Sequence, residues 1–443
     1  MRSVAPTNSG IATETVFTWT APPLVIGRGA FDELGQHARA MGLRHVAVVT
    51  DAGIARTGLA ERAIRSLDAA GISSALFADV HIEPTDDSIA AAAAWAREIR
   101  ADGYIAVGGG SAIDTAKAMN LLATNPGDVS DYLNPPIGAG RAPEQPLAPL
   151  IAVPTTAGTG AESTPVCIVG MHELRVKTGI SHPALRPRLA VVDPLTTASL
   201  PRGVTIAGGM DVLCHALESY TARPFDSRPA TPAGSIRPAY NGANPISDVW
   251  ALKALGLLGR WFRRAVEAPD DLEAREGMML AATFAGIGFG NAGVHIPHAC
   301  AYPVAGLVRD YRPADYPAGT PLVPHGLAVV ATAPAAFRFT YPSAPERHVE
   351  AARILAGRPD LGGPDALADA VTALCRDVGA PAGLAAYGYD DSDVASIVEG
   401  ALAQQRLLAV SPRPVTEADL TAIVRESIGG RSLNEAALAQ PHR

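Results

Sequence analysis

Cysteine, lysine and long apolar runs are all scarce in this chain of 443 residues. The four cysteines (Cys167, Cys214, Cys300 and Cys375) form no CxxC pair, which excludes a disulfide framework and a cysteine-rich zinc site. Only three of the 36 basic residues are lysine, and 44 acidic residues leave a net charge of −8. This acidic balance argues against nucleic acid as a partner, because such an interface needs a basic face.

The sequence also lacks the marks of a membrane or secreted protein. No apolar run reaches the roughly 18 residues that a bilayer span requires. The opening segment MRSVAPTNSGIATETVF has no apolar core of the kind that a secretory signal carries. The composition is rich in Ala and Arg, which is typical of a GC-rich bacterial genome. We therefore expect a cytoplasmic protein with no membrane partner. The protein could also be a homo-oligomer.

Strand-like runs alternate with helical patterns in the first half of the chain. Helical stretches follow at 59–70 and 86–101. The strand-like runs are 45–51, 74–80, 104–110, 148–156 and 188–194. Such alternation predicts a parallel sheet covered on both faces. Helical patterns dominate after Asp193, so we expect an α/β Rossmann-like domain over 1–200 and an all-helical domain over 201–443.

Two polar turns follow predicted strands. GGGSAIDTAK (108–117) opens a helix, with Ser111 as the expected N-cap, and free N–H groups there would suit a pyrophosphate. It is neither GxGxxG nor a Walker loop, and a purely structural turn is an equal alternative. PTTAGTGAES (154–163) adds hydroxyls at a neighbouring strand end. Asp51 ends an earlier strand, where an acid can accept from ribose hydroxyls, or simply be a solvated turn residue.

Acidic and imidazole side chains gather in the second half. Asp211 and His215 lie four residues apart on a predicted helix, so they share a face and can chelate one cation. A plain helix ion pair is the alternative for that pair alone. His295, His298 and His325 follow in apolar surroundings. Several histidines beside a chelating pair favour four ligands, and one Asp with three His suits Fe(II) or Zn(II).

Together these segments resemble the iron-containing (group III) alcohol dehydrogenase family. GGGSAIDTAK, PTTAGTGAES, GGMDVLCHALESY (208–220) and the later histidine with PHG occur in the family's order. The resemblance implies the dehydroquinate synthase-like fold, with an α/β NAD domain and a helical metal domain. It also implies a divalent metal, Fe²⁺ before Zn²⁺, with Asp211, His215, His298 and His325 as ligands.

The resemblance further implies a site for NAD. Asp51 matches the position where an acid favours NAD over NADP. The other matching positions around the cofactor are Gly109, Gly110, Ser111, Asp114, Thr155, Thr156 and Lys177. Ordinary members carry a second histidine four residues after the third ligand, often assigned to a proton relay. Tyr302 stands there in this chain, so His295 is the candidate catalytic relay, with a packing role as the alternative.

A narrower match concerns the substrates. RPAYNGANPISDVWALKAL (237–255) and GIGFGNAGVHIPHACAYPVAGLV (286–308) resemble hydroxyacid–oxoacid transhydrogenases, a branch of the family. The branch implies hydride transfer from a hydroxyacid such as 4-hydroxybutyrate to an oxoacid such as 2-oxoglutarate through bound NAD(H). Two Pro-rich loops are predicted, the first over 223–245 and the second over 309–324. Arg237 in the first and Arg309 and Arg312 in the second are candidate partners for the substrate carboxylates.

Three other functions stay open at this point. The first is a conventional NAD-dependent alcohol dehydrogenase that releases NADH at each turnover. The second is a metal-dependent lyase on the related dehydroquinate synthase-like scaffold, although Asp211 fits the alcohol dehydrogenase pattern better. The third is a non-catalytic nucleotide- or metal-binding protein, which the intact ligand and glycine motifs disfavour.

Overall fold

A computed structural model describes residues 13–171, 176–232, 234–235, 237–316 and 321–429. Within them, six strands form a parallel sheet in the order β1-β8-β5-β4-β2-β3. These strands are β1 (Leu24–Ile26), β2 (His45–Val49), β3 (Ser73–Phe77), β4 (Gly103–Gly108), β5 (Leu150–Pro154) and β8 (Leu189–Val192). The predicted strands are therefore present, and β1 is an addition that sequence patterns did not reveal.

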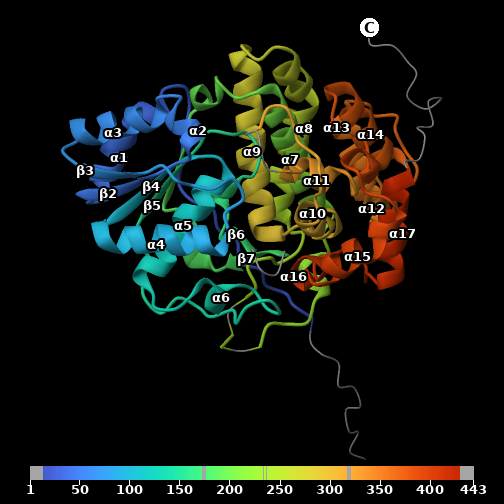
Figure 1. Cartoon of the computed structure of the whole chain (residues 1–443). Helices are drawn as coiled ribbons and strands as arrows, with labels where there is room; N and C mark the ends of the chain where they lie inside the picture. The colour runs from blue at the N-terminus through green and yellow to red at the C-terminus, as the bar shows by residue number, and fades with distance from the viewer. Residues whose placement is uncertain (1–12, 172–175, 233, 236, 317–320, 430–443) are drawn as a thin grey trace, which may run out of the picture.

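Helices cover both faces of this sheet, as Figure 1 shows. Successive residues of a strand point to opposite faces, so Val46 and Val48 join one apolar cluster while Ala47 and Val49 join another. The first cluster includes residues of α1 (Leu34–Ala40) and α3 (Leu59–Ala69), and the second includes residues of α4 (Asp86–Ile99) and α5 (Gly110–Thr124). Burial on both faces explains why the strands are apolar throughout.

The chain reverses its direction across the sheet between β2 and β4. Strand β3 pairs with one side of β2, and β4 pairs with the other side. Ligands of open α/β sheets bind at the carboxyl ends of the strands beside such a switch point. Asp51 follows β2 and the glycine turn follows β4, so both predicted cofactor segments lie at this edge.

A two-stranded antiparallel hairpin, β6 (Val166–Met171) and β7 (Val176–Ser181), lies beside the sheet. Figure 1 places it between the sheet and the helical part of the molecule. It carries Ile168 and Lys177 to the cavity described below.

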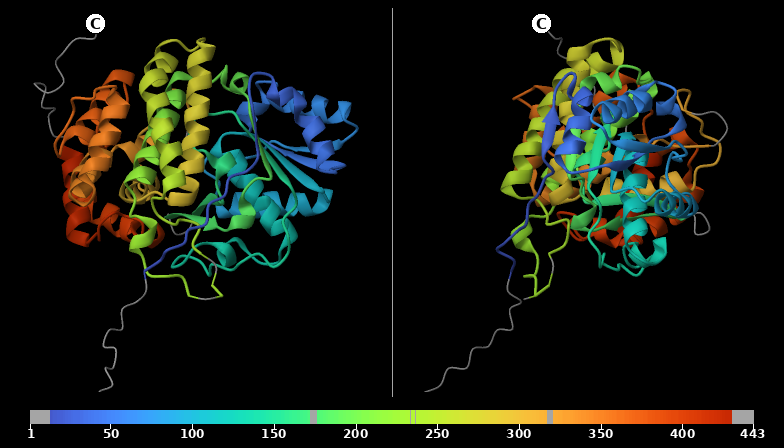
Figure 2. Two further views of the ribbon diagram at one scale, coloured as in Figure 1. Left: turned by 180° about the vertical axis from the view of Figure 1, so that it is seen from behind. Right: turned by 90° about the vertical axis from the view of Figure 1, so that its left-hand side faces the viewer.

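Only helices follow β8 in the described part of the chain. Figure 2 shows them packed along one side of the α/β part. The first of them along the chain are α7 (Arg202–Thr221), α8 (Pro245–Glu267), α9 (Leu272–Ala292), α10 (Ile296–Gly306) and α11 (His325–Val330). The later ones are α12 (Ala333–Thr340), α13 (Pro345–Ala356), α14 (Ala366–Val378), α15 (Val394–Leu402), α16 (Gln405–Leu408) and α17 (Glu417–Gly429). The domain boundary near residue 200 stays a prediction.

Among the described helices, none is by itself long and apolar enough to cross a membrane. One pair, α9 with α10, passes the same length and composition test jointly, with a bend of 104° between the two. Both helices are largely buried in the protein.

The second polar turn meets the helices backbone to backbone. A Cβ on Gly158 would lie 3.0 Å from Cα of Gly208 in α7. A Cβ on Gly160, whose φ is +61°, would lie 2.6 Å from Cα of Gly286 in α9. Glycine is therefore required on this seam between the sheet edge and the helices.

Candidate active site

Three helices bring one carboxylate and three imidazoles together. Asp211 and His215 lie one turn apart on α7, His298 lies on α10, and His325 opens α11. Oδ1 of Asp211 lies 3.5 Å from Nε2 of His215, 3.5 Å from Nε2 of His298 and 3.7 Å from Nε2 of His325. Ligand atoms of Asp211, His298 and His325 all lie within 4.8 Å of one another.

This geometry fits a divalent cation. Metal–ligand bonds of about 2.0–2.2 Å in a tetrahedron place neighbouring ligand atoms roughly 3.4 Å apart. Oδ1 of Asp211 and Nε2 of His298 are buried and have no hydrogen-bond partner in the described part of the chain. Buried polar atoms are normally paired, so these two atoms are arranged for a ligand that the chain does not supply.

Three of the four proposed ligands, Asp211, His215 and His325, are in the protonation states that bind a metal. Burial lowers the pKa of His215 to about 3 and that of His325 to about 4, so both imidazoles are neutral at pH 7. Burial alone would raise the pKa of Asp211, but His215, His325 and His298 together bring it below its usual range. Neutral imidazoles and an ionised carboxylate are the forms that bind metals.

Glu218 holds His298 in place and was missed by the sequence analysis. Its Oε1 lies 2.6 Å from Nδ1 of His298, and its Oε2 accepts the backbone N–H of His295 at 2.6 Å. Burial would lower the pKa of His298, but Glu218 and Asp211 raise it to about 9. A carboxylate on the far nitrogen of a metal-binding histidine fixes the ring and its tautomer. The available signal was spacing, since Glu218 lies two helical turns after Asp211.

His295 lies behind the cluster rather than in the cavity. It is 0% exposed, and its Nε2 lies 3.1 Å from the hydroxyl of Thr221. Its ring stands edge-on to Phe337. Burial lowers the pKa of His295 to about 4. His295 is absent from the cavity lining among the described residues, and its role as a proton relay stays a prediction beside the packing alternative.

One cavity joins this cluster to the glycine turn. Its lining includes Gly110, Ser111 and Asp114 at the sheet edge and all four predicted ligands on the helices. The wall between them is largely aromatic and aliphatic. It is formed by Tyr240, Phe289, Val294 and Tyr302. The ring of Phe289 stacks on His215 with centroids 3.9 Å apart, and the ring of His298 also stacks on His215, at 4.7 Å.

The glycine turn differs from its prediction at one residue. Gly109, not Ser111, is the N-cap of α5, and the Ser111 hydroxyl instead accepts the backbone N–H of Glu83 at 3.1 Å. The reason is that the helix begins two residues earlier than expected, at Gly110. A Cβ on Gly110 would lie 2.6 Å from Cγ2 of Thr159, so the two polar turns pack directly against each other.

The other predicted cofactor residues lie around the same edge. Thr156 lies against Gly109, where a Cβ would be 3.1 Å from its Cγ2. Oγ1 of Thr155 is buried without a hydrogen-bond partner among the described residues. Burial raises the pKa of Asp114 to about 6. Lys177 lines the cavity and forms an ion pair with Glu83.

Asp51 lies outside this lining, at the end of β2. Its Oδ1 caps α2 (Ala52–Ala55) by accepting the N–H groups of Gly53 and Ile54 at 2.8 and 3.0 Å. Its Oδ2 lies 3.8 Å from a Cβ placed on Gly108, so the carboxylate borders the glycine turn.

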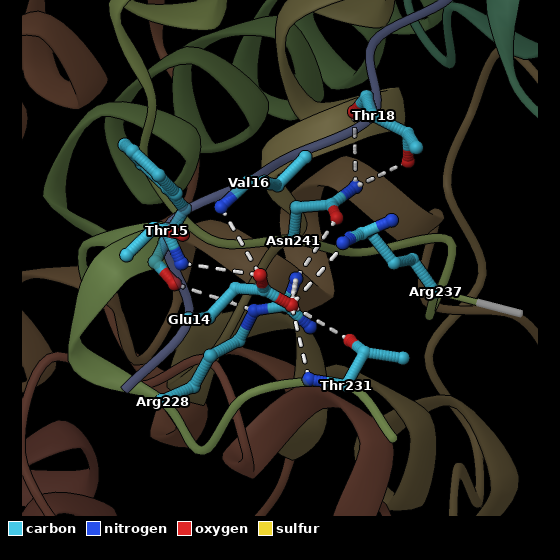
Figure 3. A network of polar contacts seen from close by, with 9 residues as sticks. Glu14, Thr15, Val16, Thr18, Arg228, Thr231, Arg237 and Asn241 are labelled. Atoms are coloured by element: carbon cyan, nitrogen blue, oxygen red, sulfur yellow. Dashed lines mark hydrogen bonds and ion pairs between the residues drawn. The ribbon is translucent and has the colours of Figure 1, made fainter. Parts of the chain in front are cut away.

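The three candidate substrate arginines are absent from the cavity lining in the described part of the chain, and their role toward the substrate stays a prediction. Arg309 is half exposed and pairs with Asp393, and Arg312 donates to the carbonyl oxygen of Asp310. Arg237 lies 3.5 Å from the buried carboxylate of Glu14, as Figure 3 shows. Their loops run over the surface, where acidic side chains and main-chain oxygens engage the guanidinium groups.

Glu14 is the centre of that network and ties the N-terminal segment to the first Pro-rich loop. It accepts hydrogen bonds from the hydroxyl of Thr231 at 2.8 Å and from its backbone N–H at 3.1 Å. Nη2 of Arg228 lies 3.5 Å from the same carboxylate oxygen of Glu14 (Figure 3). Arg237 therefore has a structural partner in this network.

Comparison with known proteins agrees with this arrangement. Residues 21–194 match the family model described as iron-containing alcohol dehydrogenase, and residues 239–428 match the C-terminal model of the same family. The hydroxyacid-oxoacid transhydrogenase of Bos taurus is 46% identical over 428 residues, which cover 95% of this chain and 91% of that protein. The transhydrogenase of Caenorhabditis elegans is 42% identical, covering 94% and 91%.

Solved structures agree as well. A 1,3-propanediol oxidoreductase superposes with a TM-score of 0.81 at 29% identity, covering 93% of this chain and all (100%) of that one. Sulfoacetaldehyde reductase from Bifidobacterium kashiwanohense, solved in complex with NAD⁺, gives a TM-score of 0.79 at 28% identity, covering 94% and 100%.

One expectation is wrong. The curated relatives are named as mitochondrial proteins, which overturns the cytoplasmic assignment. That assignment rested on amino-acid composition, which reflects codon usage rather than compartment. The fold and its relatives nevertheless agree with the motifs, and the family implies NAD(H) and a divalent metal. The chain is an oxidoreductase that belongs to the iron-containing alcohol dehydrogenase family.

Proposed function

We propose that this enzyme transfers hydride between a hydroxyacid of the 4-hydroxybutyrate type and an oxoacid of the 2-oxoglutarate type through NAD(H) that stays bound. The observation that carries the proposal is the single cavity that holds both the glycine turn and the four-residue cluster. Near full-length relatives named hydroxyacid-oxoacid transhydrogenase support the choice of substrates.

Asp211, His215, His298 and His325 would hold the divalent cation, with Fe²⁺ proposed first and Zn²⁺ second. When bound, such a cation polarises a hydroxyl or carbonyl oxygen and lowers the pKa of a bound hydroxyl group. Asp211 contributes the negative charge, and Glu218 keeps His298 oriented. The nicotinamide ring supplies the hydride chemistry when it is bound.

The remaining residues would bind and orient. Main-chain N–H groups at the start of α5 face the place of a pyrophosphate, beside Gly109, Gly110 and Ser111. Asp114, Thr155, Thr156 and Lys177 would hold the cofactor's polar groups, and Asp51 would select NAD. Tyr240, Phe289, Val294 and Tyr302 exclude water from the space between cofactor and cluster, which strengthens every charge interaction there.

The test mixes purified enzyme with 4-hydroxybutyrate and 2-oxoglutarate and adds no nicotinamide. Sustained formation of succinate semialdehyde and 2-hydroxyglutarate supports the proposal. Turnover that depends on added NAD⁺ supports a conventional dehydrogenase instead. His298→Ala and His325→Ala should lose activity and metal together, and normal rates with retained metal would refute the ligand assignment.

A further inference from the structure

The cavity that joins the glycine turn to the ligand cluster has one lysine in its wall. Among the described residues, Lys177 on β7 is the only lysine or arginine of the lining. A carboxylate that enters the cavity needs such a partner, because burying an unpaired charge is costly. The hydroxyl oxygen and the carboxylate carbon of 4-hydroxybutyrate are four bonds apart, a span of roughly 5 Å. An acid whose hydroxyl lies at the cluster therefore keeps its carboxylate inside the same cavity.

Glu83 lines this cavity as well and forms an ion pair with Lys177. Both charges lie near the ligand cluster. Burial is the main cause that lowers the pKa of His325, and among the nearby charges Lys177 lowers this pKa while Glu83 raises it. A lysine ammonium has three N–H donors, and the ion pair engages one carboxylate oxygen of Glu83. The ammonium therefore has donors left for a second carboxylate.

The backbone of Glu83 adopts a conformation that is unusual for its residue type. Its φ is +59°, in the left-handed region that residues other than glycine rarely adopt. Its backbone N–H donates to the hydroxyl of Ser111 at 3.1 Å, which ties it to the first turn of α5. Strained residues persist only where the surrounding structure holds them, and they gather at functional sites. The fold thus keeps the Glu83 carboxylate at the cavity in spite of a backbone cost.

We propose that Lys177 binds the remote carboxylate of both substrates, and that Glu83 offsets its charge and so limits how tightly each acid is held. The inference rests on the proposed function and deepens it, because it names the residues that recognise the acids. In a cycle that oxidises one acid and reduces another, the first product must leave before the second acid enters. Glu83 favours this exchange, since it keeps the ammonium paired while no acid is bound. The role proposed above for Lys177 toward the cofactor uses another of its N–H donors.

The experiment compares 4-hydroxybutyrate with butan-1-ol, which has the same carbon skeleton without the carboxylate. The measured quantity is the ratio of kcat/KM for the acid to that for the alcohol, in which an effect on cofactor binding cancels. Lys177→Met should lower this ratio about tenfold or more, since a charge-assisted hydrogen bond is worth that much. Glu83→Gln keeps the size of the side chain but removes the opposing charge, so it should raise the ratio about tenfold. Lys177→Arg keeps the positive charge and should recover part of the ratio that Lys177→Met loses.

Binding provides a second readout that is independent of turnover. Titration calorimetry with glutarate, a dicarboxylate that cannot transfer hydride, should show about tenfold weaker binding to Lys177→Met and about tenfold tighter binding to Glu83→Gln. The matched controls change the same residue types outside the cavity. Lys253→Met removes an exposed lysine of α8, and Glu144→Gln breaks an ion pair with Arg141. Both controls should stay within about twofold of the parent, because exposed charges contribute little.

The two variants distinguish recognition of the acid from a purely structural ion pair. A shift of Lys177→Met and Glu83→Gln in the same direction would overturn the inference, because it would mean that the pair only maintains the shape of the cavity. An unchanged ratio and unchanged glutarate affinity in either variant would overturn it as well. Turnover that depends on added NAD⁺ would instead overturn the proposed function. Opposite shifts of the two variants would still support the recognition of acids by Lys177.

Discussion

Glu218 lies 2.6 Å from Nδ1 of His298 and is itself 0% exposed. Glu218→Gln keeps the size of the side chain but removes the charge that orients this imidazole. Loss of such a carboxylate typically weakens metal binding about 10- to 100-fold. We expect that loss in competition against a chelator, followed by elemental analysis. The control is Glu276→Gln, at a partly exposed carboxylate that pairs with Arg28, and equal metal affinity in both variants would exclude this role for Glu218.

Gly326 allows the helix that carries His325 to approach the helix that carries Asp211. A Cβ on Gly326 would lie 1.9 Å from the carbonyl oxygen of Ala207 and 2.7 Å from the backbone nitrogen of Asp211. Gly326→Ala should therefore reduce the free energy of unfolding by about 1–3 kcal/mol and lower metal content. Chemical denaturation and metal analysis measure the two effects.

The matched control for that substitution is Gly256→Ala in α8. There a Cβ would meet Cγ2 of Ile354 at 3.8 Å, an ordinary contact. Alanine favours a helix by about 1 kcal/mol over glycine, so this variant should be as stable as the parent or more stable. Similar behaviour of the two variants would contradict the close approach of α7 and α11.

Asp51 has two roles that can be separated. Asp51→Asn keeps an acceptor for the N–H groups of Gly53 and Ile54 but removes the charge that would repel a 2′-phosphate. The ratio of kcat/KM for NADP⁺ to that for NAD⁺ should rise about tenfold or more. Asp51→Ala also removes the cap, so it should lower Tm as well. If the ratio of kcat/KM for NADP⁺ to that for NAD⁺ is unchanged in Asp51→Asn, then Asp51 does not select between the two cofactors.

Glu14 makes stability depend on pH. Hydrogen bonds from the side chain and backbone of Thr231 are the main causes that lower the pKa of Glu14 to about 2. A carboxylate with a lowered folded-state pKa stabilises the fold above its unfolded pKa of about 4.5, and that contribution is lost as pH falls toward 2. Glu14→Gln should lower Tm at pH 7, and its difference from the parent should shrink near pH 3. The exposed Glu267→Gln should show neither effect.

The sequence revealed elements whose pattern is strong and local. Burial of β2, β4, β5 and β8 on both faces leaves continuous apolar runs, so those strands could be predicted. Strand β1 is only three residues long, and the β6–β7 hairpin is partly exposed, so neither leaves such a run. Helices α11 and α12 follow each other closely but are two elements, since α11 ends at Val330 and α12 begins at Ala333. Pro334 in the first turn of α12 has no N–H to continue the hydrogen bonding of α11.

In the candidate site as well, the residues that could be predicted are those joined by a strong local pattern. Asp211 and His215 could be recognised because one helical turn joins them. The approach of His298 and His325 depends on how three helices pack, so spacing alone could not establish it. Glu218 acts on the site through His298, and its spacing two helical turns after Asp211 is the one local signal that the sequence carries for this contact. The sequence also did not show the partners of the loop arginines, such as Glu14 for Arg237, because these partners are distant in sequence.

At Gly158 and Gly160 the backbone of the second polar turn packs directly against the backbones of α7 and α9. Where main chain touches main chain, no rotamer change can absorb sliding between the sheet edge and the helices. The span from the nucleotide turn to the ligand cluster is thereby fixed, whichever small molecule enters. An enzyme that oxidises one acid and reduces another in one chamber needs the same span for both. This seam would allow the two half-reactions to succeed each other without a hinge opening between them.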